Sequence, residues 1–425
     1  MIAVCANVVD YGISNAAAQA TQLEITGFTM GKIKYKVLVA HHPDSVTPQE
    51  LQEQVDSTLQ RINQLMSTYI PESDVSRFNS SDSTDFISVD SETARVVSRA
   101  TQISEQTNGA FDITVGPAVN LWNFGPDKSS PNSLPSDDLI EQASKIIGFQ
   151  KLEVRADPPA IRKSEPKLEI DLSAIAKGYA VDMVAKTLDD AGSKQFMIEV
   201  GGEIFVRGER AGGGPWQIGV EEPDAKKSAN RPELGAKREV YRIASITDRA
   251  LATSGDYRSF FEFEGKRFSH TIDPKTCRPV DHGLATACII AKDCMTADAL
   301  ATAVMVLGPE AGQSVCKQAG VEFLFVSRDS DFGSELSELQ SDGFPVSEVE
   351  SSEKPAVKSS PAQGILPTFI GAAVIIGLAI LGMAIGSIFA NKPVQGSCGG
   401  LSNATGDDCT ICAQPTTDCL KNAEA

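Results

Sequence analysis

The sequence has 425 residues, with 56 acidic and 38 basic side chains and a formal net charge of -18. This length accommodates one large globular domain, or two ordinary ones, with appendages. The acidic balance argues against a nucleic-acid partner, because nucleic-acid phosphates select for clustered Lys and Arg.

The N-terminal segment, residues 1–25, opens with the apolar run from Met1 to Cys5. This run is too short for a signal peptide, but it is similar to the end of a lipoprotein signal. One expectation is therefore a truncated lipoprotein signal, in which Cys5 carries lipid and the chain that follows is exported. The alternative, an N-terminus without a targeting role, stays open.

The region 26–326 mixes helix and strand patterns without a regular βαβ alternation, which predicts an α+β fold. The first helix is predicted to start at Thr47, where Pro48 and Glu50 complete an N-terminal capping sequence. Helices are predicted over 47–66, 92–107, 174–191 and 296–307, the last two ending at Gly192 and Gly308. Strands are predicted over 196–200, 216–220, 240–246, 260–263, 284–291 and 321–326.

Two predicted helices carry groups that suit a metal ion or an anion. Asp298 and Thr302 are four residues apart, so a carboxylate and a hydroxyl share one helical face, and such hard oxygen ligands suit magnesium better than zinc. Lys177 lies near the start of the other helix, which Asp171 or Ser173 can cap, and a helix N-terminus attracts anions. Taken singly, each residue fits an ordinary surface role more often.

Among the four histidines, His270 is the main candidate for a general base, because it lies between a strand pattern and a turn. His282 is a second candidate. The glycine pairs and triplets at 201–202 and 212–214 match no nucleotide-binding fingerprint and predict tight turns. Four cysteines lie in or beside apolar runs and are expected to be buried: Cys277, Cys288, Cys294 and Cys316.

The C-terminal part divides into three segments. Residues 327–364 are rich in Ser, Glu, Asp, Lys and Pro, which predicts a flexible linker. Residues 365–390 contain no charged side chain and are long enough to cross the hydrocarbon core, which predicts one transmembrane helix. The tail, residues 391–425, is a separate segment with four cysteines: Cys398, Cys409, Cys412 and Cys419.

In their order along the chain, these motifs resemble the ApbE family of FAD:protein FMN transferases, from about Gly27 to Val326. The resemblance rests on segments at 29–31, 66–69, 77–79, 109–117, 121–125, 171–182, 200–202, 253–258, 269–274 and 297–299. It implies a T-fold-like α+β core and an enzyme that transfers the FMN half of FAD to a Thr or Ser hydroxyl of a target protein, releasing AMP.

The resemblance also implies roles for individual residues. Mg²⁺ would be bound by the backbone carbonyl of Ala174 with Asp298 and Thr302, and Asp298 would thereby be essential to catalysis. His270 would accept the hydroxyl proton or, alternatively, donate to the phosphate. Cys277 departs from the family, which usually has Gly there. FAD would be contacted by Met30, Tyr69, Ala110, Phe111, Asp112, Asp171, Lys177 and Ile272.

The tail resembles NqrM-like maturation proteins, which have a membrane helix followed by Cys-Gly-Gly-Leu, here residues 398–401, and further cysteines. The resemblance implies an iron or zinc site in the tail and target proteins among the subunits of the sodium-translocating NADH:quinone reductase. It also implies a single-pass protein of the inner membrane, with a periplasmic soluble domain and a cytosolic tail.

Two rival functions remain open. An FAD pyrophosphatase would use water in place of the protein hydroxyl at the same site. A non-catalytic flavin- or metal-binding assembly factor of the membrane would depend on the membrane helix and the cysteines. The presence of His270, Asp298 and Thr302 together argues against the second rival, because a pure binding protein does not need all three.

Overall fold

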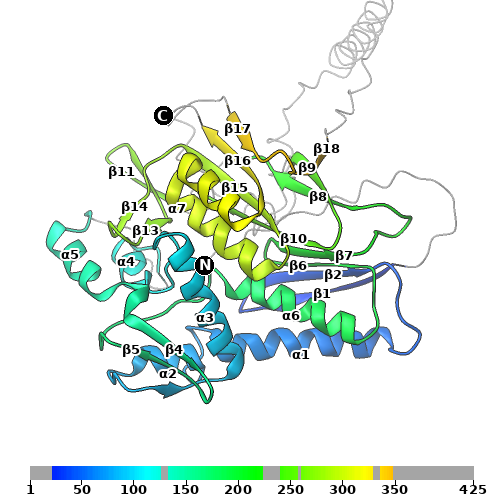
Figure 1. Ribbon diagram of the computed structural model, residues 1–425, viewed down its shortest axis with the longest axis horizontal. Coiled ribbons are helices and arrows are strands. Elements are labelled where there is room, and N and C mark those ends of the chain that lie inside the picture. The colour runs from blue at the N-terminus through cyan, green and yellow to red at the C-terminus, as the bar shows by residue number, and fades with distance from the viewer. Residues whose placement is uncertain (1–21, 126–132, 224–239, 257–259, 329–335, 348–425) are drawn as a thin grey trace, which may run out of the picture. The chain divides into compact units, whose positions relative to one another are not determined.

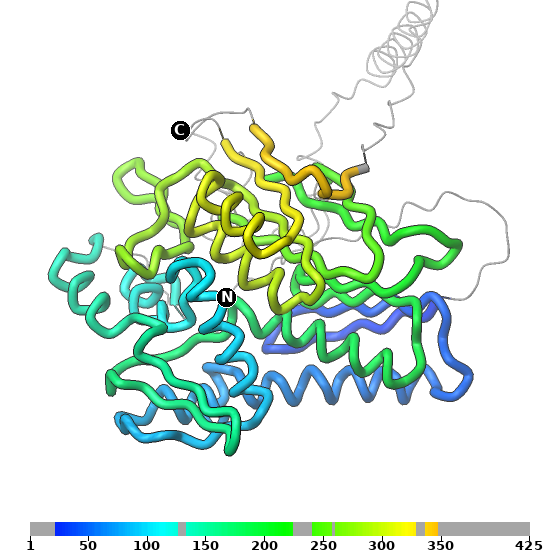
Figure 2. Tube along the Cα trace, viewed as in Figure 1, coloured from blue at the N-terminus to red at the C-terminus, as the bar shows by residue number. Residues whose placement is uncertain are grey.

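The computed structural model describes residues 22–125, 133–223, 240–256, 260–328 and 336–347 (Figure 1). Within these residues, no helix is long and apolar enough to cross a bilayer. The predicted transmembrane helix at 365–390, the cysteine-rich tail and the lipoprotein-like start all lie outside the described residues. Figure 2 traces the described chain from its N-terminal strands to its last strand at 346–347.

The centre of the fold is an eight-stranded sheet in which every neighbouring pair is antiparallel. Side chains alternate between its faces, so Phe196 and Ile198 join one apolar core while Met197 joins another. In sheet order the strands are β1 (Leu23–Thr29), β2 (Ile33–Val39), β6 (Phe196–Val200), β7 (Glu203–Arg207), β10 (Arg249–Gly255), β15 (Leu284–Ala291), β16 (Glu322–Arg328) and β17 (Leu336–Gln340).

Three long helices, α1 (Pro48–Met66), α6 (Ala176–Asp190) and α7 (Cys294–Ala319), share the larger core with one face of this sheet (Figure 1). The predicted capping box of α1 is present, with reciprocal bonds between Thr47 and Glu50. Within α7 the helical backbone breaks at Gly308 (φ 76°), as predicted, and a second helical stretch then runs to Ala319. The predicted helix end at Gly308 is therefore confirmed, and the stretch that follows it was not predicted.

The other face of the sheet is covered by a three-stranded sheet made of β8 (Trp216–Glu221), β9 (Val240–Ile246) and β18 (Val346–Ser347). Strands β17 and β18 fall within the segment predicted as a flexible linker. They pair with β16 and β9 through main-chain bonds, and Phe344 between them is buried. The described fold accordingly extends to Ser347. The described α+β architecture agrees with the predicted class.

The remaining elements form a smaller region beside the ends of the sheet strands. A third apolar cluster joins α4 and α5 to the β13–β14 hairpin through Trp122, Ile272 and Cys277. These elements are α2 (Asp74–Ser80), β3 (Ile87–Ser88), α3 (Ser91–Gln106), α4 (Gly116–Leu121), α5 (Asp137–Ile146), the 3₁₀ turn η1 (Phe149–Lys151), β4 (Leu152–Ala156), β5 (Pro159–Lys163), β11 (Phe260–Phe263), β12 (Lys266–Ser269), β13 (Ile272–Asp273) and β14 (Arg278–Pro279).

Candidate functional site

Two tight turns lie together at one end of the central sheet. Met30 and Gly31 have positive φ (47° and 87°) between β1 and β2, and Gly201 and Gly202 have positive φ (65° and 110°) between β6 and β7. The Gly201 N–H donates to the carbonyl of Lys34 over 3.1 Å, which joins the two turns. The turn predicted at 201–202 is confirmed, and it starts β7 at the carboxylate of Glu203.

Helices α6 and α7 run antiparallel at this site, side by side in Figure 1. The Asp182 carboxylate accepts bonds from the Cys294 and Met295 N–H groups over 2.7 and 2.9 Å. Four residues further along each helix, the Gly178 N–H donates to Asp298 Oδ2 over 3.0 Å. Of the three predicted magnesium ligands, Asp298 lies in this helix contact, Thr302 lies one turn further along α7, and Ala174 precedes the first residue of α6.

A buried cluster of charges lies between these helices and the start of β7. The Lys177 Nζ is 3.4 Å from Asp298 Oδ1 and also pairs with Glu203 Oε1. Both carboxylate residues are only 2% exposed. Burial by itself disfavours the ammonium, but the two carboxylates outweigh it and raise the pKa of Lys177 above its ordinary value. Lys177 therefore stays charged beside the N-terminus of α6, where an anion is favoured.

The start of α6 differs from its prediction in a way that bears on metal binding. Neither Asp171 nor Ser173 caps the helix; Ile175 occupies the N-cap without a side-chain bond, and Asp171 Oδ1 instead accepts the Ser173 N–H over 2.8 Å. In a regular helix the Gly178 N–H would bond to the Ala174 carbonyl. Here it bonds to Asp298, and no other described backbone N–H donates to that carbonyl.

The chemistry of the predicted ligands suits a hard divalent cation. A backbone carbonyl, a carboxylate and a hydroxyl, from Ala174, Asp298 and Thr302, are all oxygen donors, and magnesium takes few protein oxygens together with waters and substrate phosphates. Among the described residues, no group of three or more His, Cys, Asp and Glu side chains gathers as a soft or zinc-type site would require.

A second group of predicted site residues follows α3. Ala110, Phe111 and Asp112 are all buried. Asp112 Oδ1 accepts bonds from the Thr114 N–H and hydroxyl (2.8 and 2.7 Å), and Oδ2 accepts the Phe149 N–H (2.9 Å). Burial raises the pKa of this carboxyl, and these bonds oppose the rise. The Asp112 carboxylate therefore stabilises the loop that contains it and ties this loop to Phe149.

The remaining predicted flavin contacts come from separate loops and, for Ile272, from the short strand β13. The Asp171 N–H donates to the Ile113 carbonyl over 2.8 Å, which fixes the Asp171 segment against the loop of Asp112. Met30 packs partly buried against the main core, and the Tyr69 side chain is 58% exposed. Ile272 is buried in the third cluster. Of the predicted flavin contacts, Lys177 belongs to the charge cluster, while the others lie in loops or, for Ile272, in β13.

His270 directly follows β12 and lies half-buried at the end of a row of aromatic rings. Its ring meets Phe124 edge-on at a centroid distance of 6.3 Å. The row continues from Phe124 through Phe261 and Phe268 to Trp122, with centroid distances of 5.1 to 5.7 Å. These rings restrict the orientation of the imidazole.

The second candidate, His282, contacts two backbone positions of the fold. Its Nδ1 accepts the Leu284 N–H over 3.4 Å, and its ring lies against the kink at Gly308, where a Cβ would approach it to 3.3 Å.

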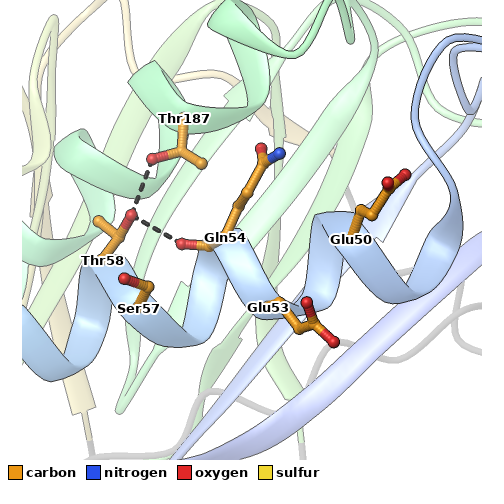
Figure 3. A pocket seen from close by; sticks show the side chains of 6 residues that line it. All are labelled: Glu50, Glu53, Gln54, Ser57, Thr58 and Thr187. Atoms are coloured by element: carbon orange, nitrogen blue, oxygen red, sulfur yellow. Dashed lines mark hydrogen bonds between the residues drawn. The ribbon is translucent and has the colours of Figure 1, made fainter.

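Two pockets of the described surface lie away from this cluster. One pocket of about 460 Å³ is a polar hollow between α1 and α6, where the Thr58 and Thr187 hydroxyls meet over 2.9 Å (Figure 3). None of the predicted site residues lines it. A second, of about 390 Å³, lies beside the aromatic row and is lined in part by Trp122, Phe268 and His282.

The cysteines of the described region are confirmed as buried: Cys277, Cys288, Cys294 and Cys316. Cys277 adopts a positive φ of 53°, as expected where a glycine is usual, and its carbonyl accepts the Trp122 indole N–H over 2.8 Å.

Glu203 is the functional candidate that the sequence analysis missed. Its only local signal is an acidic residue directly after a glycine turn, at the start of an otherwise apolar strand.

Comparison with known proteins agrees with this geometry. The model of the ApbE family matches residues 29–325, and the model described as (Na+)-NQR maturation NqrM matches residues 387–425. A FAD:protein FMN transferase of Vibrio cholerae is 38% identical over 312 residues, which cover 73% of this chain and 89% of the relative. The corresponding protein of Escherichia coli K12 is 35% identical over 307 residues, covering 72% and 84%.

Solved structures show the same relationship. The flavin transferase ApbE from Vibrio cholerae superposes with a TM-score of 0.67 at 37% identity, covering 76% of this chain and 98% of that one. The apo form of the Pseudomonas stutzeri flavinyl transferase ApbE gives a TM-score of 0.67 at 32% identity, covering 77% and 97%. The chain carries an NqrM-type segment at its C-terminus, and from residue 29 to residue 325 it belongs to the ApbE family.

Proposed function

We propose that this chain is an FAD:protein FMN transferase, which moves the FMN half of FAD onto a Thr or Ser hydroxyl of another protein. The observation that carries the proposal is the buried cluster of Lys177 with Asp298 at the N-terminus of α6. It occurs in a chain that covers 89% of a relative bearing this name.

The chain's own residues supply binding, orientation and proton transfer. The N-terminus of α6 and the charged Lys177 attract the pyrophosphate of FAD. The acceptor hydroxyl attacks the phosphorus of the FMN half; a new P–O bond forms, the bond to the AMP oxygen breaks, and AMP leaves. His270 accepts the hydroxyl proton or, alternatively, donates to the phosphate. The proposed FAD contacts are Met30, Tyr69, Ala110, Phe111, Asp112, Asp171, Lys177 and Ile272.

The Ala174 carbonyl, Asp298 and Thr302 are proposed to hold Mg²⁺, which would withdraw charge from the pyrophosphate when bound. The support is the antiparallel register of α6 and α7 together with the Ala174 carbonyl, which no described backbone N–H occupies.

The acceptor proteins are proposed to be subunits of the sodium-translocating NADH:quinone reductase. The support is the NqrM match at 387–425 on the same polypeptide. Cys398, Cys409, Cys412 and Cys419 are then proposed to bind iron or zinc while that complex matures. An assembly factor without catalysis would not explain why Lys177 forms a buried charge cluster with Asp298 and Glu203.

The uncharged stretch 365–390 is proposed to cross the inner membrane once, with the folded domain in the periplasm and the tail in the cytosol. Protease added to sealed vesicles should digest one end of the chain and spare the other. Digestion or protection of both ends together would overturn this topology.

Flavin transfer is tested by incubating the detergent-solubilised full chain with FAD, Mg²⁺ and a threonine-bearing fragment of a reductase subunit. We expect flavin fluorescence that stays with the fragment on a denaturing gel and is lost with Asp298→Asn. Asp190→Asn is the matched control, because this acid also lies on α6 but is exposed, and among the described residues it pairs with Lys186 alone. Free FMN and AMP without label would favour the pyrophosphatase, and bound flavin without turnover would favour the assembly factor.

A further inference from the structure

Glu203 is a buried acid for which the proposed chemistry has no role. Its residue is 2% exposed, and its Oε1 pairs with the Lys177 Nζ. Its Oε2 is buried and has no hydrogen-bond partner among the described residues. A buried carboxylate oxygen without a partner is costly, so such a residue in a native fold calls for an explanation.

The local sequence places the Glu203 carboxylate on the face of the sheet that packs against α1, α6 and α7. Val200 and Glu203 pair across a two-residue turn whose glycines both have positive φ, the geometry that closes a tight hairpin. Alternation along β7 then directs Glu203 and Phe205 toward the helices and Ile204 toward the opposite core. The Cys294 thiol donates to the Ile204 carbonyl over 3.5 Å, which fixes the start of α7 against the same strand.

The Lys177 ammonium is shared between two carboxylates. It contacts Glu203 Oε1 closely and lies 3.4 Å from Asp298 Oδ1. If Glu203 lost its charge, the ammonium would retain Asp298 as its one anionic partner in this cluster. Lys177 would then compete directly with any cation that Asp298 binds, because opposite charges in a buried site attract strongly.

We propose that Glu203 is a positioning residue that draws the Lys177 ammonium away from Asp298 and so keeps the Asp298 carboxylate available to a divalent cation. The inference rests on the proposed function for the identity of the cation site. In this arrangement two carboxylates serve two cations: Glu203 pairs with the Lys177 ammonium, and Asp298 binds the metal.

Three variants separate this role from direct metal binding. Glu203→Gln keeps the size of the side chain and should weaken divalent-cation binding about 10–100-fold, the range seen when partners of metal ligands are removed. Lys177→Met removes the competing ammonium and should strengthen binding. In the double variant most of the Glu203→Gln effect should vanish, because residues that act through one another are not additive.

The experiment is a Mn²⁺ titration of the solubilised full chain without FAD, with free Mn²⁺ measured by electron paramagnetic resonance. Mn²⁺ is the probe because it prefers oxygen ligands over the thiolates of the tail. Glu199→Gln is the matched control, since Glu199 lies on the paired strand β6 but on the opposite face of the sheet. It should bind Mn²⁺ like the wild type.

Two results would overturn the proposal: wild-type Mn²⁺ affinity in Glu203→Gln, or a loss that persists in full in the Lys177→Met background, which would make Glu203 a ligand itself. Circular dichroism checks the fold of each variant. If Glu203→Gln does not fold, Lys177→Met alone decides, because unchanged or weaker binding contradicts competition. The Mn²⁺ pattern does not depend on flavin transfer, so its outcome is independent of the transfer assay.

Discussion

Replacing Gly178 by alanine tests the close approach of α6 and α7 that builds the site. A Cβ at this position would lie 2.3 Å from the Cys294 carbonyl oxygen and 2.7 Å from the Met295 Cα. Both atoms belong to backbone and cannot rotate away. The helices would have to separate by roughly 1 Å to reach an ordinary contact of 3.4 Å.

The expected cost follows from two effects. Overpacking a well-packed interface destabilises by about 1–3 kcal/mol. The separation also stretches the bond from the Gly178 N–H to Asp298 Oδ2, and hydrogen bonds to charged groups contribute about 1.5–3 kcal/mol. Because one displacement causes both losses, we expect Gly178→Ala to lower the free energy of unfolding by about 2–4 kcal/mol.

Urea unfolding followed by far-ultraviolet circular dichroism measures this loss. Gly116→Ala is the matched control, because a Cβ there meets no heavy atom within 4 Å and the backbone φ is not positive. The same preparations should show weaker Mn²⁺ binding for Gly178→Ala alone. Equal unfolding midpoints for the two variants would refute the close helix contact and the register derived from it.

Three further predictions concern residues around the sheet and the helix pair. Burial raises the pKa of Glu199 from 4.5 to about 7, so folding stability is lost as the pH rises from 4.5 through 7; Glu199→Gln should therefore add about 2 kcal/mol to the free energy of unfolding at pH 8 and close to nothing below the unfolded pKa of 4.5. An equal gain at both pH values would contradict this cause. Cys277→Val should cost about 1–3 kcal/mol in urea unfolding, because a β-branched residue resists a positive φ, whereas Cys277→Gly should stay near the wild type. Asp182→Ala should cost about 1–3 kcal/mol and weaken Mn²⁺ binding, because the Cys294 and Met295 N–H groups lose their acceptor; Asp190→Ala should change neither measurement.

Local signals in the sequence were sufficient for much of the fold. Helix α1 starts at Pro48 because Thr47 and Glu50 form a capping box, and its five buried residues recur at the helical spacing of three or four positions. Strands β6, β9, β11 and β15 have the predicted bounds. Each of these elements is specified by its own residues, through a cap or through an apolar run of strand length between turn signals.

Features that depend on distant residues could not be predicted in the same way. Helix α7 continues beyond Gly308 because its second half packs back on the first; a Cβ at Gly312 would already lie 2.8 Å from Val304. Strand β17 lies in a polar segment and forms by main-chain pairing with β16, which composition does not reveal. The role of Glu203 likewise appears only when β7 is placed beneath Lys177.

The same helix contact that stabilises the fold also sets the chemistry. Asp182 anchors the start of α7 to α6, and Gly178 lets the two backbones approach until its N–H reaches Asp298. That bond takes the N–H which would otherwise occupy the Ala174 carbonyl. The carbonyl, Asp298 and Lys177 are therefore placed by a single helix register. A change that loosens this register should weaken cation binding before it unfolds the protein, because metal ligands tolerate smaller displacements than a packed core does.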